Sequence, residues 1–183
     1  MIFIRTQLEG LFEIETSSQD DARGKFSRLF CEQVFSAIRP GLHFTQINLS
    51  ETASKGTIRG MHFQTPPSAE AKLICCLHGH VFDVAVDVRT ASPTFLQWHA
   101  VELDDKNNKM VFIPEGFAHG FQALSNDVQL LYMHTADWSK PHEHGLRHDD
   151  PRLAIQWPLR AAMVSEKDLG HDLLKPEFSG VQL

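Results

Sequence analysis

"HVFDVAVDVR" (residues 80–89) is the clearest strand signal in the chain. Successive side chains of a strand point to opposite faces, so a period of two separates this stretch into two series. The first series is Phe82, Val84, Val86 and Val88, and the second is Val81, Asp83, Ala85 and Asp87. The apolar series predicts a face packed on a core. The series with two acids either lines a polar cavity or faces solvent.

Other β-rich stretches surround it at short spacing. We expect strands over residues 42–50, 72–77, 98–103, 110–114 and 128–134. Turn signals separate them at residues 78–79, 91–94, 104–108 and 125–127. Many short strands with such turns predict an antiparallel sandwich or barrel, an all-β fold. Helical periodicity is scarce: residues 20–38 are ambiguous, with one or two helical turns over 31–38, and short helices are expected after residue 165.

Composition limits the class of protein. The chain has 183 residues, 42% of them hydrophobic and 22% charged, which predicts a single globular domain over residues 1–183. Its formal net charge of −6 disfavours a nonspecific nucleic-acid binder. We find no signal peptide and no apolar run long enough for a membrane helix. Cys31, Cys75 and Cys76 form no CxxC motif, so a reducing cytoplasm is expected.

Two stretches resemble the motifs of the cupin superfamily. "GTIRGMHFQTPPSAEAK" (residues 56–72) resembles the first motif, and "IPEGFAHGF" (residues 113–121) resembles the second. Cupins are double-stranded β-helices (jelly rolls), so the resemblance implies the fold class that the strand spacing predicts. We therefore expect an all-β cupin-type jelly roll with a few short helices, mainly near the C-terminus.

Metal-binding cupins place about four ligands in one pocket. Here Gln64 replaces the second histidine of the first motif, and Glu70 lies away from the usual spacing. His62 and His119 remain as nitrogen ligands, and two imidazoles alone rarely hold a transition metal. We therefore expect acid–base chemistry without a metal. A metal-dependent cupin isomerase or oxygenase is the alternative.

One family within the superfamily matches most of the chain. The sequence resembles dTDP-4-dehydrorhamnose 3,5-epimerases and related nucleotide-sugar C3/C5 epimerases from about residue 21 to 168. The resemblance lies in "DARGKFSRLF", "FTQINLS", "GTIRGMHFQTPP", "EAKLICCLHGHVFDVAVDVRTASPTF", "VFIPEGFAHGFQALS", "LLYMHTADW", "EHGLRHDDPRLAIQWP" and "SEKD". It implies proton removal beside a 4-keto group and return on the opposite face, at C3, C5 or both, without a cofactor. It also implies a homodimer.

The resemblance assigns four catalytic residues, and the chemistry of each suits its role. His62 is the base, and Asp168 orients its ring. Lys72 stabilises the enolate oxygen, and Tyr132, the only tyrosine, delivers a proton from the other face. The structural alternatives are a satisfied histidine at 62, an exposed edge lysine at 72 and a helix N-terminal acid at 168.

The resemblance also assigns the substrate-binding residues. Arg23 and Arg59 match phosphate contacts; Gln46 and Asn48 match polar pocket positions. Phe26 and Trp138 match aromatic positions around the nucleotide base; for Phe26 an ordinary core role is the alternative. His119 contacts the sugar or enolate oxygen, or else only hydrogen-bonds inside the barrel. The remaining assigned residues are Arg28, Glu143 and Lys167.

Two departures fall where the base should bind. Arg28 stands where many family members have an acid, and Trp138 where many have tyrosine. The nucleotide therefore stays open, and so does an enzyme that epimerises a single carbon of a CDP- or GDP-linked 4-keto sugar. A sugar-binding cupin without catalysis is the third hypothesis. The N-terminal segment is expected to reach the partner subunit, where Arg23 and Phe26 would complete its site.

Overall fold

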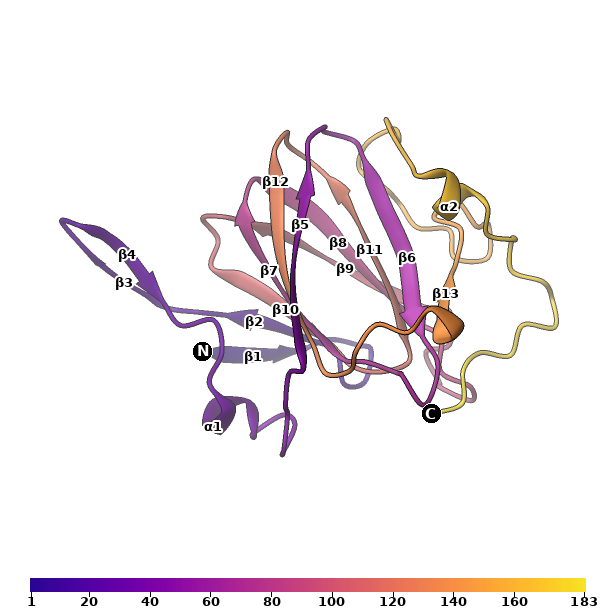
Figure 1. Ribbon diagram of the computed structural model, residues 1–183, viewed down its shortest axis with the longest axis horizontal. Coiled ribbons are helices and arrows are strands. Elements are labelled where there is room, and N and C mark those ends of the chain that lie inside the picture. Colours follow the sequence, from indigo (N-terminus) through magenta and orange to yellow (C-terminus); the bar gives the residue numbers. More distant parts are fainter.

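The computed structural model describes residues 1–183 and consists mainly of antiparallel strands (Figure 1). A six-stranded sheet has the spatial order β1 (Ile2–Arg5), β2 (Phe12–Glu15), β10 (Lys109–Ile113), β7 (Lys72–His78), β12 (Val128–His134) and β5 (Gln46–Thr52). A five-stranded sheet has the order β13 (Glu143–Gly145), β6 (Ile58–Gln64), β11 (Phe117–Ala123), β8 (His80–Asp87) and β9 (Trp98–Asp104). A hairpin of β3 (Ser18–Asp21) and β4 (Gly24–Ser27) projects from the body (Figure 1).

The two large sheets face each other and enclose the main core (Figure 1). Ile74 and Leu130 enter this core from the six-stranded sheet, and Val81, Ala85 and Phe121 enter it from the five-stranded sheet. Two packed antiparallel sheets whose neighbouring strands are mostly not consecutive in sequence confirm the predicted jelly roll.

The outer face of each sheet is also covered. On the six-stranded sheet, Phe35 of the helix α1 (Glu32–Phe35) lies against Phe112, with ring centroids 6.4 Å apart. On the five-stranded sheet, the C-terminal segment packs Leu153 and Ile155 against the strands. The protein therefore has three apolar layers, and only the middle layer lies between the sheets.

Strand β8 shows the predicted alternation, but neither of its faces meets solvent. Val84 and Val86 pack under the C-terminal segment, whereas Val81 and Ala85 belong to the main core. Asp83 is 1% exposed and points into the interior. The solvent-facing alternative was therefore wrong: this face lies in the main core, where Asp83 contacts His119 of the cavity wall.

Two strands at the centre of the fold, β6 and β11, were missing from the predicted set, although each overlaps one of the two cupin-like motifs. Each carries a glycine, which weakens a strand pattern. The two glycines meet: a Cβ at Gly60 would lie 2.5 Å from the Cα of Gly120, and the φ of Gly60 is 119°. The backbones therefore approach so closely that neither position has room for a side chain.

The helices are short, as predicted. α1 lies inside residues 31–38, and η1 (Lys140–His142) and α2 (Glu166–Leu169) lie toward the C-terminus. None of these helices is long and apolar enough to cross a membrane. Cys76 faces the main core and Cys75 the outer layer, and all three cysteine thiols are free.

Candidate functional site

A cavity of about 270 Å³ opens between the two sheets. Most of the predicted site residues line it: Asn48, Arg59, His62, Lys72, His119, Tyr132, Trp138 and Glu143. The residues that line it without having been assigned a role are Ser50, Phe63, Gln64, Glu70, Phe121 and His134. Strand register explains the convergence, because His62 lies opposite His119 on β6 and β11, and Tyr132 lies opposite Asn48 on β12 and β5.

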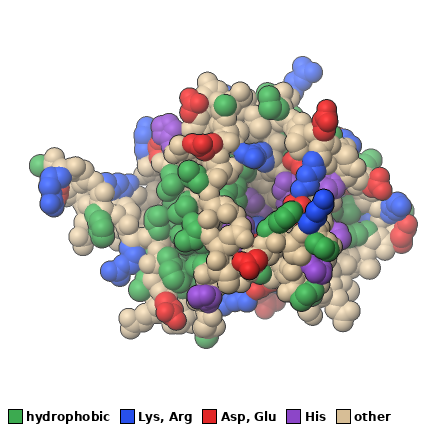
Figure 2. Space-filling model, in the orientation of Figure 1, with side chains coloured by type: hydrophobic (Ala, Val, Ile, Leu, Met, Phe, Trp, Pro, Cys, Tyr) green, Lys and Arg blue, Asp and Glu red, His purple; other side chains and the backbone are tan.

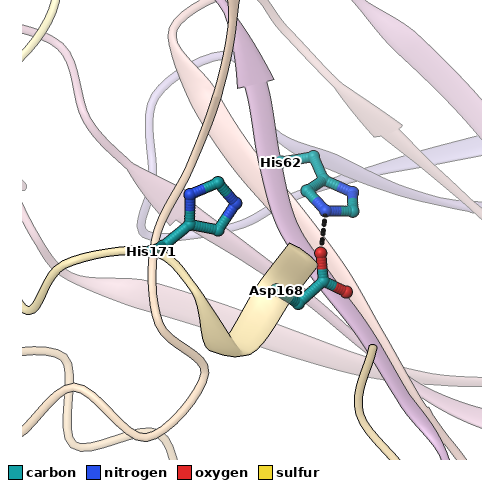
Figure 3. A group of neighbouring side chains, drawn as sticks. All are labelled: His62, Asp168 and His171. Atoms are coloured by element: carbon teal, nitrogen blue, oxygen red, sulfur yellow. Dashed lines mark hydrogen bonds and ion pairs between the residues drawn. The ribbon is translucent and has the colours of Figure 1, made fainter. Parts of the chain in front are cut away.

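His62 and Asp168 form a close pair (Figure 3). The Nε2 of His62 lies 2.6 Å from an Asp168 carboxylate oxygen, and the His62 side chain is 36% exposed whereas that of Asp168 is 4% exposed. The backbone N–H of Gly60 donates to the second carboxylate oxygen at 3.3 Å. Burial raises the pKa of the Asp168 carboxyl, but the hydrogen bond and charge of His62 outweigh it and hold that pKa below its usual value.

The helix α2 fixes Asp168 in this position. Ser165 is the N-cap residue, and its hydroxyl accepts a hydrogen bond from the Asp168 N–H at 3.1 Å. Asp168 therefore belongs to the first turn of a helix, as the structural alternative supposed. Its carboxylate also contacts His62, so Asp168 is both a helix N-terminal acid and the partner of the histidine.

Tyr132 presents a free phenol to the cavity. Its hydroxyl makes no hydrogen bond to the protein, and its ring lies between His119 and His134, at centroid distances of 5.8 Å and 5.9 Å. Burial, and then the charge of Asp83, raise the pKa of the phenol well above its usual value. The group is therefore protonated at neutral pH and free to donate.

Lys72 is paired with an acid that sequence reasoning did not assign. Its ammonium lies 2.8 Å from Glu70, whose other oxygen lies 2.7 Å from Nδ1 of His134. Lys72 lies on β7, inside the six-stranded sheet, with its side chain 8% exposed, so the edge-lysine alternative is wrong. Burial raises the pKa of Glu70, but the hydrogen bond of His134 and the charge of Lys72 outweigh it, and the carboxyl stays ionised.

His119 is hydrogen-bonded inside the barrel. Its Nε2 lies 2.9 Å from Asp83, and both side chains are buried. The alternative that His119 only hydrogen-bonds inside the barrel is therefore correct for Nε2. The ring still lines the cavity beside Tyr132, so it also contributes to the cavity wall.

Arg59 lies at the junction of two cavities. It lines the first cavity and, with His62, an adjoining one of about 570 Å³. Its Nη1 donates to the Ser50 hydroxyl and the Glu51 carbonyl, both at 3.0 Å. These contacts hold an exposed guanidinium at the rim, where it can meet an anionic group.

Polar residues at the other rim of the cavity contact one another. The backbone N–H of Trp138 donates to the side-chain oxygen of Gln46 at 3.3 Å, and Trp138 is 56% exposed. Lys167 donates to Glu143 at 2.8 Å. Burial raises the pKa of Glu143, but the Lys167 contact outweighs it, so this carboxyl is ionised.

Three predicted residues lie far from this cavity. Arg23, Phe26 and Arg28 belong to the projecting hairpin or directly follow it (Figure 1). Phe26 is 72% exposed, so the core-residue alternative is wrong. Arg23 contacts only Asp21 of its own hairpin. None of the three lines the cavity of its own chain.

Strand alternation could have found two of the missed residues. His134 lies two positions after Tyr132 on β12 and so shares its face. Asp83 lies on the β8 face that was predicted to line a polar cavity. Glu70 precedes β7 in a connection, where no periodicity applies, and only the fold brings it to Lys72.

One group of side chains has the donor atoms of a metal site: His62, Asp168 and His171, with ligand atoms within 4.8 Å of one another (Figure 3). This is not the pair considered from the sequence. The Nε2 atoms of His62 and His119 are each occupied by a different carboxylate, Asp168 and Asp83.

Comparison with known proteins identifies the family of this chain. The family model described as dTDP-4-dehydrorhamnose 3,5-epimerase matches residues 5–176. A Sinorhizobium fredii protein of that name is 44% identical, over 81% of this chain and 76% of its own length. A dTDP-4-dehydrorhamnose 3-epimerase from Streptomyces niveus is 38% identical, over 88% and 78%.

A solved structure has the same fold. The dTDP-6-deoxy-D-glucose-3,5-epimerase of Legionella pneumophila, in complex with dTDP-4-keto-L-rhamnose, superposes with a TM-score of 0.88 at 39% identity, covering 92% of this chain and 89% of its own. The resemblance found in the sequence motifs is thus confirmed over nearly the whole length. The chain belongs to the dTDP-4-dehydrorhamnose 3,5-epimerase family.

Proposed function

We propose that this protein epimerises C3, C5 or both carbons of a dTDP-linked 4-keto-6-deoxyhexose. The observation that carries the proposal is one cavity that holds both a carboxylate-paired histidine, His62, and a free, protonated phenol, Tyr132. The family and its named relatives support the dTDP-linked 4-keto sugar. Relatives named as 3,5-epimerases and as a 3-epimerase are similarly identical to this chain, so the number of inverted carbons stays open.

His62 removes the proton. A carboxylate can only accept, so the short contact to Asp168 requires Nε2–H of His62 to donate and leaves the lone pair on Nδ1. Nδ1 takes the proton from the carbon beside the ketone. The Asp168 carboxylate then stabilises the imidazolium that forms.

Lys72 lowers the energy of the enolate. Loss of the C–H proton places negative charge on the former ketone oxygen, and an ammonium fixed beside it favours that charge. The contact with Glu70 holds the Lys72 side chain in place at low solvent exposure. The protein therefore has its cation positioned before the substrate arrives.

Tyr132 returns a proton on the opposite face. Its hydroxyl is unpaired in the cavity and stays protonated at working pH. Donation to carbon leaves a phenolate, which solvent protonates before the next turnover. Removal by His62 on one face and return by Tyr132 on the other together invert the carbon.

The rim residues hold the nucleotide. Arg59 provides a fixed guanidinium for the diphosphate, since a planar fork matches phosphate oxygens. Asn48 and Trp138 line the cavity and form the pocket wall for the base, and Gln46 supports this wall through its contact with Trp138. Glu143 and Lys167 close this region as an ion pair.

The active form is a homodimer in which each hairpin completes the neighbouring site. On the edge strand β5, Asn48 faces the cavity side, whereas Ile47 and Leu49 alternate with it and are 63% and 54% exposed. Figure 2 shows hydrophobic side chains gathered between the hairpin and the middle of this face. An uncovered apolar edge is a surface that a second copy can cover.

Subunit mixing tests this arrangement. Arg23→Ala and His62→Asn chains are each expected to be inactive alone. If the hairpin crosses, a mixed dimer combines His62 of one chain with Arg23 of the other in one intact site, and activity returns. No recovery on mixing, or a fully active monomer in light scattering, would contradict the crossing.

We place the protein in the cytoplasm. Three free cysteines, two of them adjacent and buried, suit a reducing compartment. Fractionation of the source cells would test this.

Solvent exchange tests the division of labour between the two faces. In deuterated water, His62→Asn should abolish exchange of the sugar C–H. Tyr132→Phe should keep exchange, because His62 can return a deuteron to the same face, while epimer formation falls by about 10²–10⁴-fold. Mass spectrometry counts the exchanged carbons and thereby distinguishes one from two. Loss of exchange in both variants would refute the assignment of Tyr132 as the acid.

A further inference from the structure

A second histidine lies beside the catalytic pair. The ring of His171 follows α2 and lies 6.5 Å from the ring of His62, at an interplanar angle of 69° (Figure 3). Gly145 of β13 leaves the space for it, because a Cβ there would lie 2.1 Å from the His171 Nε2. The φ of Gly145 is not positive, so the ring and not the backbone requires a glycine at this position.

The environment of His171 suits a metal ligand. Its Nε2 is buried and has no hydrogen-bond partner, which leaves a polar atom uncompensated. The carboxyl of Asp168 lies beside it and offers an oxygen ligand.

We propose that His62, Asp168 and His171 form an inhibitory site for a divalent transition metal, with Zn²⁺ as the best fit. Two imidazoles and one carboxylate are the donors of many three-ligand zinc sites. The ligand atoms already lie within 4.8 Å of one another. Tetrahedral zinc needs its ligand atoms roughly 3.4 Å apart, so His171 would approach by up to about 1.4 Å and the 2.6 Å contact between His62 and Asp168 would open by about 0.8 Å.

Metal at this site would disable the base by a change of tautomer. The ion replaces the proton between His62 and Asp168 and binds Nε2 of His62. That proton passes through solvent to Nδ1, so the imidazole stays neutral. Nδ1 is the atom that takes the sugar proton, and once it carries a hydrogen it has no lone pair. The hydrogen bond between His62 and Asp168 keeps the lone pair on Nδ1, and a metal that replaces this bond inhibits the enzyme because Nδ1 is then protonated.

Zinc titration of the metal-free enzyme tests the proposal. Zn²⁺ should inhibit the wild type reversibly, with activity restored by a chelator, and Mg²⁺ should not, because it prefers oxygen ligands. His171→Ala should keep the uninhibited rate while the inhibitory Zn²⁺ concentration rises at least about tenfold. His43→Ala, which removes an exposed histidine without a side-chain hydrogen bond, is the matched control and should be inhibited like the wild type.

Calorimetric zinc binding provides a readout that does not depend on turnover. The tight binding event should be present in the wild type and in His43→Ala, and absent or at least about tenfold weaker in His171→Ala and in His62→Asn. Circular dichroism confirms that each variant is folded. Tight binding that survives in His171→Ala overturns the proposal, whatever the activity of that variant, and so does inhibition of equal potency in the two histidine-to-alanine variants.

Discussion

The single tyrosine allows a direct test of the electrostatics of the site. Tyrosinate absorbs in the near ultraviolet where the neutral phenol does not, and every such signal from this chain comes from Tyr132. The unfolded chain should ionise with the ordinary phenol pKa of about 10 and be half ionised at about pH 10. In the folded protein burial and Asp83 raise the pKa of Tyr132 well above this, so only a small minority should be ionised at the same pH.

The same shift predicts a loss of stability in alkali. A phenol whose pKa is raised by folding contributes stability that is fully present below the unfolded pKa and is lost as pH rises toward the folded value. Between the two values the loss is about 1.4 kcal/mol per pH unit. For a chain of this size that lowers the melting temperature by about 3–5 °C per unit. Tyr132→Phe lacks this loss, so the difference between the two melting curves isolates it from other titrations.

Asp83→Asn completes the test by removing the second cause of the shift. Its neutral amide should lower the pKa of Tyr132 toward the ordinary value, and the tyrosinate signal should begin at lower pH than in the wild type. Circular dichroism at each pH shows that the protein is still folded. A wild-type midpoint at about pH 10 in a folded protein would refute the burial argument. No change in Asp83→Asn would refute the electrostatic one.

Four other substitutions separate binding, charge and backbone effects. Arg59→Ala should raise KM at least about tenfold with a small change in kcat, whereas Lys72→Ala should lower kcat by about 10²–10³-fold in steady-state assays, because the enolate contact strengthens only in the transition state. Asp87→Asn should cost about 1.5–3 kcal/mol of unfolding free energy near neutral pH. Burial raises the Asp87 pKa but hydrogen bonds led by that of Arg89 lower it overall, so this difference should shrink as pH falls below about 4 in urea titrations. Gly60→Ala should lower the melting temperature by several degrees or prevent folding, since its Cβ would meet backbone at 2.5 Å; a wild-type melting curve would contradict this.

Local pattern predicted the β strands well where one residue type dominates a face. The alternation of β8 and the apolar run of β7 appear in the structure as predicted. β6 and β11 were missed because Gly60 and Gly120 interrupt their pattern, and those glycines are required by a close approach between strands that a single sequence does not reveal. The jelly roll itself could be predicted because turn spacing and the two cupin-like motifs pointed to the same fold.

The site was predictable where the family motif assigns a residue and not where the fold alone creates a contact. His62 and Asp168 are 106 residues apart, and only the resemblance linked them before their contact was seen. Glu70 and His134 lie 64 residues apart and match no assigned position, so their network with Lys72 was missed. Arg23 and Phe26 were assigned to substrate binding but do not line the cavity of their own chain. This is what a role in the site of the partner subunit, the sequence-based expectation, requires.

The two halves of the proposed proton-transfer machinery are held in place by different contacts. Tyr132 and Lys72 stand on adjacent strands inside the six-stranded sheet, and Lys72 is further fixed by Glu70. The proposed base depends on a different support, because Asp168 comes from a four-residue helix and is held by the Ser165 cap, the His62 contact and the N–H of Gly60 on β6. Short helices contribute little stability of their own, so the position of Asp168 depends on these contacts. The proposed acid and cation therefore belong to the two-sheet barrel, whereas the strength of the proposed base depends on the C-terminal segment. This is the segment that also carries His171, so any ligand that moves it acts on His62 first.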